Sequence, residues 1–403
     1  MEDNFKIVVV GDVDSGKSTL IGRFLYETGS LSQEAIEEIG DVCRRLQGNF
    51  EFAYLLDSLE EERRNQLTID TTQVFCKVKR GKVFIFIDVP GHQELIKNML
   101  CGVSQADIAI LVVDVQKSIE QQTKRHAFIL AFLGIEDIIL ALNKMDVVGF
   151  NENTYEKVKV EIIGLFKNLG ITPSYILPIS AKQGENLCEQ SKKMEWDKGL
   201  SLISVLNTCF NKKKDNGNFR FPIQDIYNLD GENVAVGKII SGKINKGDEV
   251  NILPLNKVCK INTIKVLNKN KSLAKSPESI GLVLDKMDDL RRGQVLCKPK
   301  LPQVNRKILA KVFCVHPLKI NETLNFRCTT QESHAQIKQV KRVWDSGSLE
   351  SKTKGDTLED NDFAEAIIFT ENPVVVESFK GFNGLGRFVL QSNREICAVG
   401  IIH

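Results

Sequence analysis

The sequence predicts an α/β domain built on a parallel sheet, followed by two all-β barrels. The first half of the 403 residues alternates short runs rich in Val and Ile with stretches of helical character, which is typical of a parallel sheet covered by helices. The second half has short Val- and Ile-rich runs between turn signals and few long helical patterns. A polar, charged, glycine-containing segment separates the two halves. We therefore expect an α/β domain over 1–210, a linker over 211–218, and barrels over 219–300 and 304–403.

The expected strands of the first domain are buried runs that each lead into a polar or glycine-containing loop. In open α/β folds, ligands bind at the carboxyl edge of the sheet, so the loops that follow these runs form the candidate site. The runs are KIVVV (6–10), VFIFID (83–88), DIAILVVD (107–114), DIILALN (137–143) and YILPIS (175–180).

Charge and hydropathy exclude several classes of protein. Lys plus Arg number 54 and Asp plus Glu 52, and the net charge of +2 gives no reason to expect broad attraction to nucleic acid or membranes. The apolar runs are too short to span a membrane, and the acidic start does not look like a secretory signal. The ten cysteines are scattered without a CxxC pair. We expect a cytoplasmic protein with reduced thiols and no membrane or nucleic-acid partner.

The first loop, GDVDSGKST, fits the phosphate-binding pattern G-x-x-x-x-G-K-[ST] between a strand and a helix that opens at Lys17. Its glycines let backbone N–H groups surround the phosphates, and Lys17 reaches the β and γ oxygens as a catalytic group. The Ser18 hydroxyl would bind Mg²⁺. A glycine turn that binds nothing is the alternative, and the surrounding strand and helix argue against it. The predicted nucleotide-binding residues are Gly11, Asp12, Val13, Asp14, Ser15, Gly16, Lys17, Ser18 and Thr19.

The second loop, DVPGH (88–92), closes a buried strand. Asp88 can hold Mg²⁺ through a water molecule, and the Gly91 N–H can point at a γ-phosphate, whose loss would release the loop. His92 is then placed to orient the attacking water. Taken alone, His92 would be a surface histidine beside a turn. Together with the phosphate loop, the motif favours the catalytic interpretation.

The third loop, NKMD (143–146), indicates which base is bound. Asp146 can accept the N1–H and the exocyclic amine of guanine, whereas adenine lacks that donor pattern, so the carboxylate would lose charged hydrogen bonds worth about 1.5–3 kcal/mol each. We expect Asn143 to tie this loop to its neighbours and the Lys144 stem to cover the base plane. The weight of this short motif comes from its order and spacing after the other two.

The fourth loop, SAK, follows the last strand and completes the predicted pocket. The backbone N–H groups of Ser180, Ala181 and Lys182 can reach the guanine carbonyl. Four loops in this order predict a P-loop GTPase domain rather than an ATPase. GTP and Mg²⁺ are the expected ligands.

Several longer segments accompany the four loops. They are FEFAYLLDSLEEERRNQLTIDTT (50–72), TKRHAFILAFLGI (123–135), LPISAKQGENL (177–187), MEWDKG (194–199), FRFPIQDIYNLDGENVAVGKIISGKINKGDEV (219–250) and LGRFVL (385–390). With its four loops the sequence resembles the translation-factor class of GTPases, such as elongation factors Tu and 1A. With these segments it is similar, over nearly the whole chain, to the GTPase subunits of bacterial sulfate adenylyltransferases.

The resemblance implies that Thr68, in LTID, closes over the nucleotide as a catalytic residue and completes the Mg²⁺ shell with Ser18 and Asp88. Thr71 and Thr72 are alternatives, and all three could instead be strand threonines. The sequence departs from the family where Gln66-Leu67 replaces a usual glycine, which would alter switch closure or the hydrolysis rate. It departs again at Asp14-Ser15 and before Trp196, where the usual proline is absent.

The resemblance also implies a partner. A smaller catalytic subunit, in a heterodimer or larger complex, would form adenylylsulfate and diphosphate from ATP and sulfate, and GTP hydrolysis by this chain would supply free energy for sulfate assimilation. A second P-loop does not occur before His403, so a fused adenylylsulfate kinase is not expected. Two alternatives stay open: a translational GTPase that delivers aminoacyl-tRNA, and a GTP-binding scaffold with negligible hydrolysis.

Overall fold

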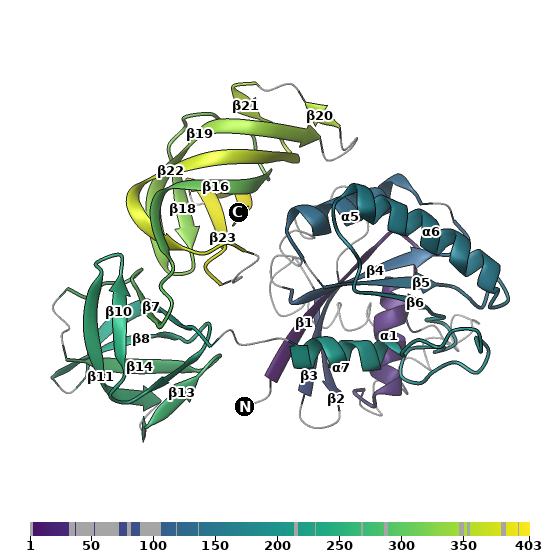
Figure 1. The fold of residues 1–403 in the computed structure, drawn as a ribbon, viewed down its shortest axis with the longest axis horizontal. Coiled ribbons are helices and arrows are strands. Elements are labelled where there is room, and N and C mark those ends of the chain that lie inside the picture. Colours follow the sequence, from purple (N-terminus) through teal and green to yellow (C-terminus); the bar gives the residue numbers. More distant parts are fainter. Residues whose placement is uncertain are drawn as a thin grey trace. The chain divides into compact units, whose positions relative to one another are not determined.

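The chain forms two compact units, Met1–Lys213 (unit 1) and Lys214–His403 (unit 2), each described separately (Figure 1). The computed structural model describes the following residues: 3–31, 37, 52, 72–78, 82–88, 106–117, 119–135, 137–212, 217–229, 231–266, 269–285, 289–345, 350–352, 355–379, 384–393 and 395–403. No helix in these ranges is both long enough and apolar enough to span a membrane.

Unit 1 is built on a six-stranded sheet with the strand order β2-β3-β1-β4-β5-β6. β2 runs antiparallel to β3, and the other neighbours are parallel. The central strands are buried on both faces, which is why they read as continuous Val- and Ile-rich runs. The strands are β1 (Asp3–Gly11), β2 (Thr72–Val78), β3 (Lys82–Asp88), β4 (Ile108–Asp114), β5 (Ile138–Asn143) and β6 (Tyr175–Pro178).

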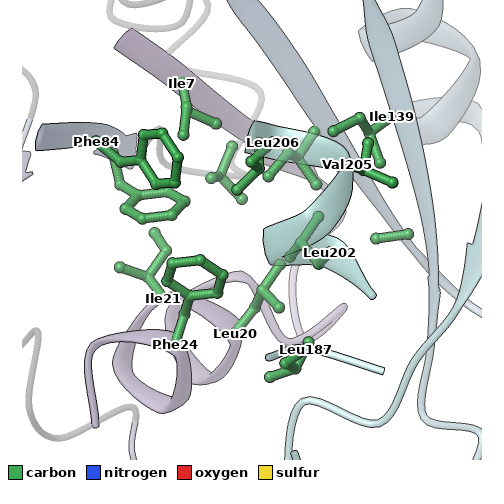
Figure 2. Close-up of a cluster of buried hydrophobic side chains, with 14 of the residues drawn as sticks. Ile7, Leu20, Ile21, Phe24, Phe84, Ile139, Leu187, Leu202, Val205 and Leu206 are labelled. Atoms are coloured by element: carbon green, nitrogen blue, oxygen red, sulfur yellow. The ribbon is translucent and has the colours of Figure 1, made fainter. Parts of the chain in front are cut away.

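Helices cover both faces of this sheet (Figure 1). α1 and α7 pack on one face, and α5 and α6 lie on the other. Figure 2 shows Leu20 and Phe24 of α1 gathered with Phe84 of β3 and Leu206 of α7 in a single core. This packing holds α1 against the sheet and therefore positions the loop between β1 and α1. The helices are α1 (Lys17–Glu27), α5 (Gln121–Phe132), α6 (Glu152–Asn168) and α7 (Leu202–Lys212).

The first half of unit 2 is a barrel of six strands in the order β10-β15-β7-β8-β14-β11, closed by pairing of β10 with β11. β12 extends the sheet, and β9 pairs with β13. Closure leaves no open edge among the six strands. The strands are β7 (Phe219–Leu229), β8 (Glu232–Lys238), β9 (Lys243–Asn245), β10 (Glu249–Leu253), β11 (Lys257–Val266), β12 (Lys269–Lys271), β13 (Leu273–Lys275), β14 (Ser279–Leu284) and β15 (Val295–Lys298).

The second half of unit 2 closes in the same way, with the order β18-β23-β24-β16-β22-β19 and pairing of β18 with β19. β20 extends this sheet, and β17 pairs with β21. The strands are β16 (Gln303–Cys314), β17 (Leu318–Lys319), β18 (Leu324–Cys328), β19 (Gln331–Asp345), β20 (Ser351–Lys352), β21 (Thr357–Leu358), β22 (Asp362–Val376), β23 (Arg387–Ser392) and β24 (Glu395–Ile402).

The predicted fold class, an α/β domain followed by two all-β barrels, is confirmed. Between the two units, α7 ends at Lys212 and β7 begins at Phe219, so the segment predicted as a linker, 211–218, begins within the last turn of a helix. Thr72, one of the alternatives to Thr68, is the first residue of β2. Thr68 and Thr71 lie outside the described residues.

Candidate nucleotide-binding site

The phosphate loop connects the end of β1 at Gly11 to the start of α1 at Lys17. Lys17 turns back over the loop, where its Nζ donates to the carbonyl oxygens of Gly11, at 2.9 Å, and Asp12, at 2.8 Å. Burial lowers the pKa of Lys17, and the nearby carboxylates of Asp88, Asp12 and Asp14 oppose that shift. The loop therefore holds its ammonium group in place, so binding phosphate requires little further ordering of this side chain.

Asn143, at the end of β5, joins three loops. Its Nδ2 donates to the carbonyl oxygen of Ser15 at 2.8 Å, and its Oδ1 accepts from the N–H of Ala181 at 2.9 Å. The residue is only 2% exposed, so both bonds lie away from water. Since a buried amide left without partners is costly, the phosphate loop, the NKMD loop and the SAK loop are fixed relative to one another.

Gly16 allows this close approach. Its φ is +93°, a region that L side chains rarely adopt, and a Cβ at this position would lie 2.4 Å from Asn143 Nδ2. The glycine is therefore required both by the backbone and by the neighbouring amide.

We expect Gly16→Ala to weaken GTP binding at least about tenfold, because the methyl group pushes Asn143 away from Ser15 and the backbone strain adds about 1–2 kcal/mol. Gly29→Ala is the matched control. Gly29 also has a positive φ, +68°, but nothing lies within 4 Å of its Cβ position. Titration of both variants with a fluorescent GTP analogue separates the effect of backbone strain from that of the Asn143 contact. Equal affinities of the two variants would contradict a role for that contact.

Asp146 and Lys144 each have a partner that orients the side chain. Ser180 Oγ donates to Asp146 Oδ1 at 2.6 Å and itself accepts from the N–H of Gln183 at 3.1 Å. Lys144, with a φ of +69°, forms an ion pair of 2.8 Å with the buried Asp114 at the end of β4. The carboxylate and the lysine stem are thus held at the carboxyl edge of the sheet.

The two predicted Mg²⁺ ligands that the structure describes lie together. Ser18 Oγ donates to Asp88 Oδ2 at 3.4 Å, which links the start of α1 to the end of β3. A hydroxyl and a carboxylate are ligands that Mg²⁺ uses in nucleotide sites, together with water and phosphate oxygens. This pair fits Mg²⁺.

The structure brings the described residues of the four loops to one edge of the sheet, and Asp88 is the one residue of DVPGH among them. Ser15 and Ala181 are buried, whereas Val13, Asp14 and Lys182 are exposed. Thr68, Gly91 and His92 lie outside the described residues, so their roles stay predictions.

Asp114, which the motifs did not include, is a further residue of this edge. The register pairs it directly with Asn143 on the neighbouring strand. The signal was present in the sequence, because Asp114 ends a buried strand in the same way as Asp88 ends its strand.

His126 of α5 was missed as well. It is buried beside the charges of the phosphate loop, and its Nδ1 has no hydrogen-bond partner among the described residues. Burial, together with the positive charge of Lys17, lowers the pKa of His126 to about 4, although Asp12 opposes the shift. The histidine is neutral in the folded chain at pH 7.

This shift predicts that unit 1 loses stability in mild acid. The ordinary pKa of 6.5 lies above the folded value of about 4, so the unfolded chain binds more protons between those pH values, and stability falls as the pH falls through that window. We expect the free energy of unfolding to decrease by about 2 kcal/mol between pH 7 and pH 5, and His126→Leu to remove this part of the pH dependence. His334, exposed on β19, provides the control His334→Leu. Urea unfolding at pH 7 and pH 5 measures the change in the free energy of unfolding. If this change is the same in wild type and His126→Leu, the prediction is wrong.

A mostly parallel sheet with a phosphate loop, a strand-end carboxylate and the NKMD loop at one edge defines a P-loop nucleotide-binding protein. Residues 2–212 match the family model "Elongation factor Tu GTP binding domain", residues 233–297 match "Elongation factor Tu domain 2", and residues 307–403 match "GTP-eEF1A C-terminal domain-like". The chain belongs to the elongation factor Tu/1-alpha family of GTPases. It is therefore a translation-factor-like GTPase, as the four loop motifs and the resemblance together indicated.

Two groups of relatives are about equally similar. The chain is 33% identical over 413 residues to sulfate adenylyltransferase subunit 1 of Bacteroides fragilis, covering 100% of this chain and 86% of that protein. It is 34% identical over 419 residues to elongation factor 1-alpha of Pyrobaculum aerophilum, covering 99% of this chain and 94% of that protein.

Proposed function

We propose that this chain is the GTPase subunit of a sulfate adenylyltransferase and couples GTP hydrolysis to adenylylsulfate formation by a smaller catalytic subunit. The observation that carries the proposal is the similarity over the whole chain to sulfate adenylyltransferase subunit 1 of two Bacteroides species, each at 33% identity. The net charge of +2 supports it, because a tRNA carrier gains affinity from a strongly basic surface.

Aminoacyl-tRNA delivery is the second candidate, and the equal similarity to elongation factor 1-alpha favours it. The two functions share the GTP site, so the arrangement of Lys17, Asn143 and Asp146 agrees with both. Only the behaviour of the chain toward a partner separates them.

In either function, the site would work through the same residues. Lys17 would bind the β- and γ-phosphates, and Ser18 and Asp88 would hold Mg²⁺ together with Thr68. His92 would orient the attacking water. Bound Mg²⁺ would neutralise charge that develops on the phosphate oxygens.

Coupling requires that the γ-phosphate changes the state of a protein segment. Ser18 lies at the start of α1 and Asp88 at the end of β3, so a metal and γ-phosphate held between them would order the DVPGH and LTID loops. Release of phosphate would free those loops and alter the surface offered to the catalytic subunit.

The test is reconstitution with a purified small catalytic subunit of a sulfate adenylyltransferase. We expect ATP and sulfate together to raise GTP turnover severalfold, and adenylylsulfate formation to depend on GTP. Lys17→Met should abolish both effects, which ties the turnover to this site. Absence of stimulation, combined with salt-dependent binding of aminoacyl-tRNA in a filter assay, would instead establish the second candidate. Phosphate release in a single turnover excludes the scaffold alternative.

A further inference from the structure

The outer face of the second barrel of unit 2 has an apolar centre. β22 lies between β16 and β19 (Figure 1), and the residues that alternate with the barrel core point outward. Leu309 of β16 and Gln339 of β19 lie opposite Ile367 of β22, and Phe369 is the next outward residue of β22. Leu309 is 39% exposed and Phe369 41%. A sheet face that contacts only water is usually polar, so this cluster needs another explanation.

Two irregularities in β19 add positive charge beside this centre. The register of β19 on β22 shifts twice, and Lys338 and Lys341 are the two β19 residues within this pairing that have no partner on β22. Both are exposed. A bulge re-aims a side chain at the expense of ladder hydrogen bonds, and bulges recur next to functional surfaces.

Cations without an ion pair are a feature of this face. The three strands carry six cations and five acids, and one of the acids is buried, so the net charge of the remaining groups is +2 (6 − 4). Two of the acids form ion pairs with cations of other strands, Glu332 with Arg327 of β18 and Asp345 with Lys352 of β20. Five of the six cations, Lys311 being left aside, form no ion pair within the described part of the chain. The cations are Arg306, Lys307, Lys311, Lys338, Lys341 and Arg342, and the acids are Glu332, Asp345, the buried Asp362, Glu365 and Glu371.

We propose that this β16–β22–β19 face binds the smaller catalytic subunit, and that the matching surface of that subunit is acidic with an apolar centre. This proposal rests on the proposed function. An apolar core with a charged rim is the usual anatomy of a protein–protein interface. The cations would attract and orient the partner, while Leu309, Ile367 and Phe369 would be desolvated against it. RNA would use the cations and could stack a base on Phe369, but it would gain little from the aliphatic side chains of Leu309 and Ile367, because its backbone offers charged phosphates and sugars.

The experiment measures binding of the purified catalytic subunit to the full-length chain. In the test variant, Lys338→Glu and Lys341→Glu reverse the two bulge lysines. In the matched control, Lys243→Glu and Lys275→Glu reverse two exposed lysines that lie opposite each other on β9 and β13. At low ionic strength, we expect the Kd of the test variant to be about tenfold higher than that of wild type, and the Kd of the control to rise by less than about twofold. The difference between the test variant and wild type should shrink as salt is added. Phe369→Asn should mainly accelerate dissociation.

The outcomes separate this proposal from the proposed function. Binding of wild type and the test variant with equal affinity overturns the docking face and leaves the proposed function standing. Failure of wild type to bind the catalytic subunit overturns both. Binding of aminoacyl-tRNA that is weakened by the test variant but not by the control assigns the face to RNA and overturns docking of the subunit. GTP affinity of each variant, unchanged in every case, confirms that unit 1 is intact.

Discussion

Asp146→Asn is expected to lower the affinity for GTP by about 10²- to 10⁴-fold while leaving the weak affinity for ATP unchanged. The carboxylate would accept two hydrogen bonds from guanine, and hydrogen bonds to a charged group are each worth about 1.5–3 kcal/mol. Ser180 fixes how the new side chain lies. Its hydroxyl donates to Oδ1 of Asp146 at 2.6 Å, so the amide oxygen of asparagine takes that position and its NH₂ group points toward the base.

An NH₂ group at this point repels the exocyclic amine of guanine but can donate to a carbonyl. Xanthine carries a carbonyl where guanine carries the amine, so we expect Asp146→Asn to bind xanthosine triphosphate more tightly than GTP. Competition against a fluorescent GTP analogue measures all three nucleotides. Asp137→Asn is the matched control, because Asp137 also accepts from a serine, Ser174 Oγ at 3.0 Å, at the opposite end of β5. If the ratio of the affinities for GTP and ATP is the same in Asp146→Asn as in the control, a residue other than Asp146 selects guanine.

The residues of this site that could be predicted from the sequence belong to motifs of a few consecutive residues. GDVDSGKST and NKMD each follow a buried strand, and parallel strands bring their carboxyl ends to one edge, so contiguous motifs are enough to place Lys17 and Asp146. The hydrogen bond from Asn143 to Ser15 spans 128 positions, and only the expectation that the NKMD loop contacts its neighbours anticipated it.

Features that depend on exact register or on a single distant partner were not predictable. Period-two alternation identifies β19 as a strand but says nothing about where Lys338 and Lys341 interrupt the pairing, because a bulge depends on both strands. The burial of His126 beneath the phosphate loop depends on how α5 packs, and a lone histidine in a helix gives no such signal.

The same limit applies to the contact between the two barrels of unit 2. Arg220, on β7, is only 1% exposed, and its Nη2 and Nε donate to Glu377 Oε1 and Oε2 at 2.8 and 3.0 Å. Its Nη1 donates to the carbonyl oxygen of Phe219 at 2.9 Å. The partners are 157 positions apart, and one arginine among many in the sequence does not reveal a buried pair. An apolar cluster from both barrels accompanies the ion pair, consisting of Leu253, Val295, Cys297, Val375 and Leu385.

Removing one side of this pair should destabilise unit 2 strongly. Arg220→Met leaves the carboxylate of Glu377, which is 18% exposed, without its two guanidinium bonds, and breaking a buried pair in this way costs about 3–5 kcal/mol. The double variant Arg220→Met with Glu377→Met should recover most of the loss, because apolar side chains of similar length join the neighbouring cluster and no charge is left unpaired. The control is Lys257→Met, which removes a pair whose side chains are 57% and 59% exposed and should change stability by less than about 1 kcal/mol. Urea unfolding of the full chain, followed by hydrogen exchange of peptides from each unit, assigns the transition to unit 2. If Arg220→Met unfolds at the same urea concentration as Lys257→Met, water already solvates Glu377, and the ion pair does not hold the barrels together.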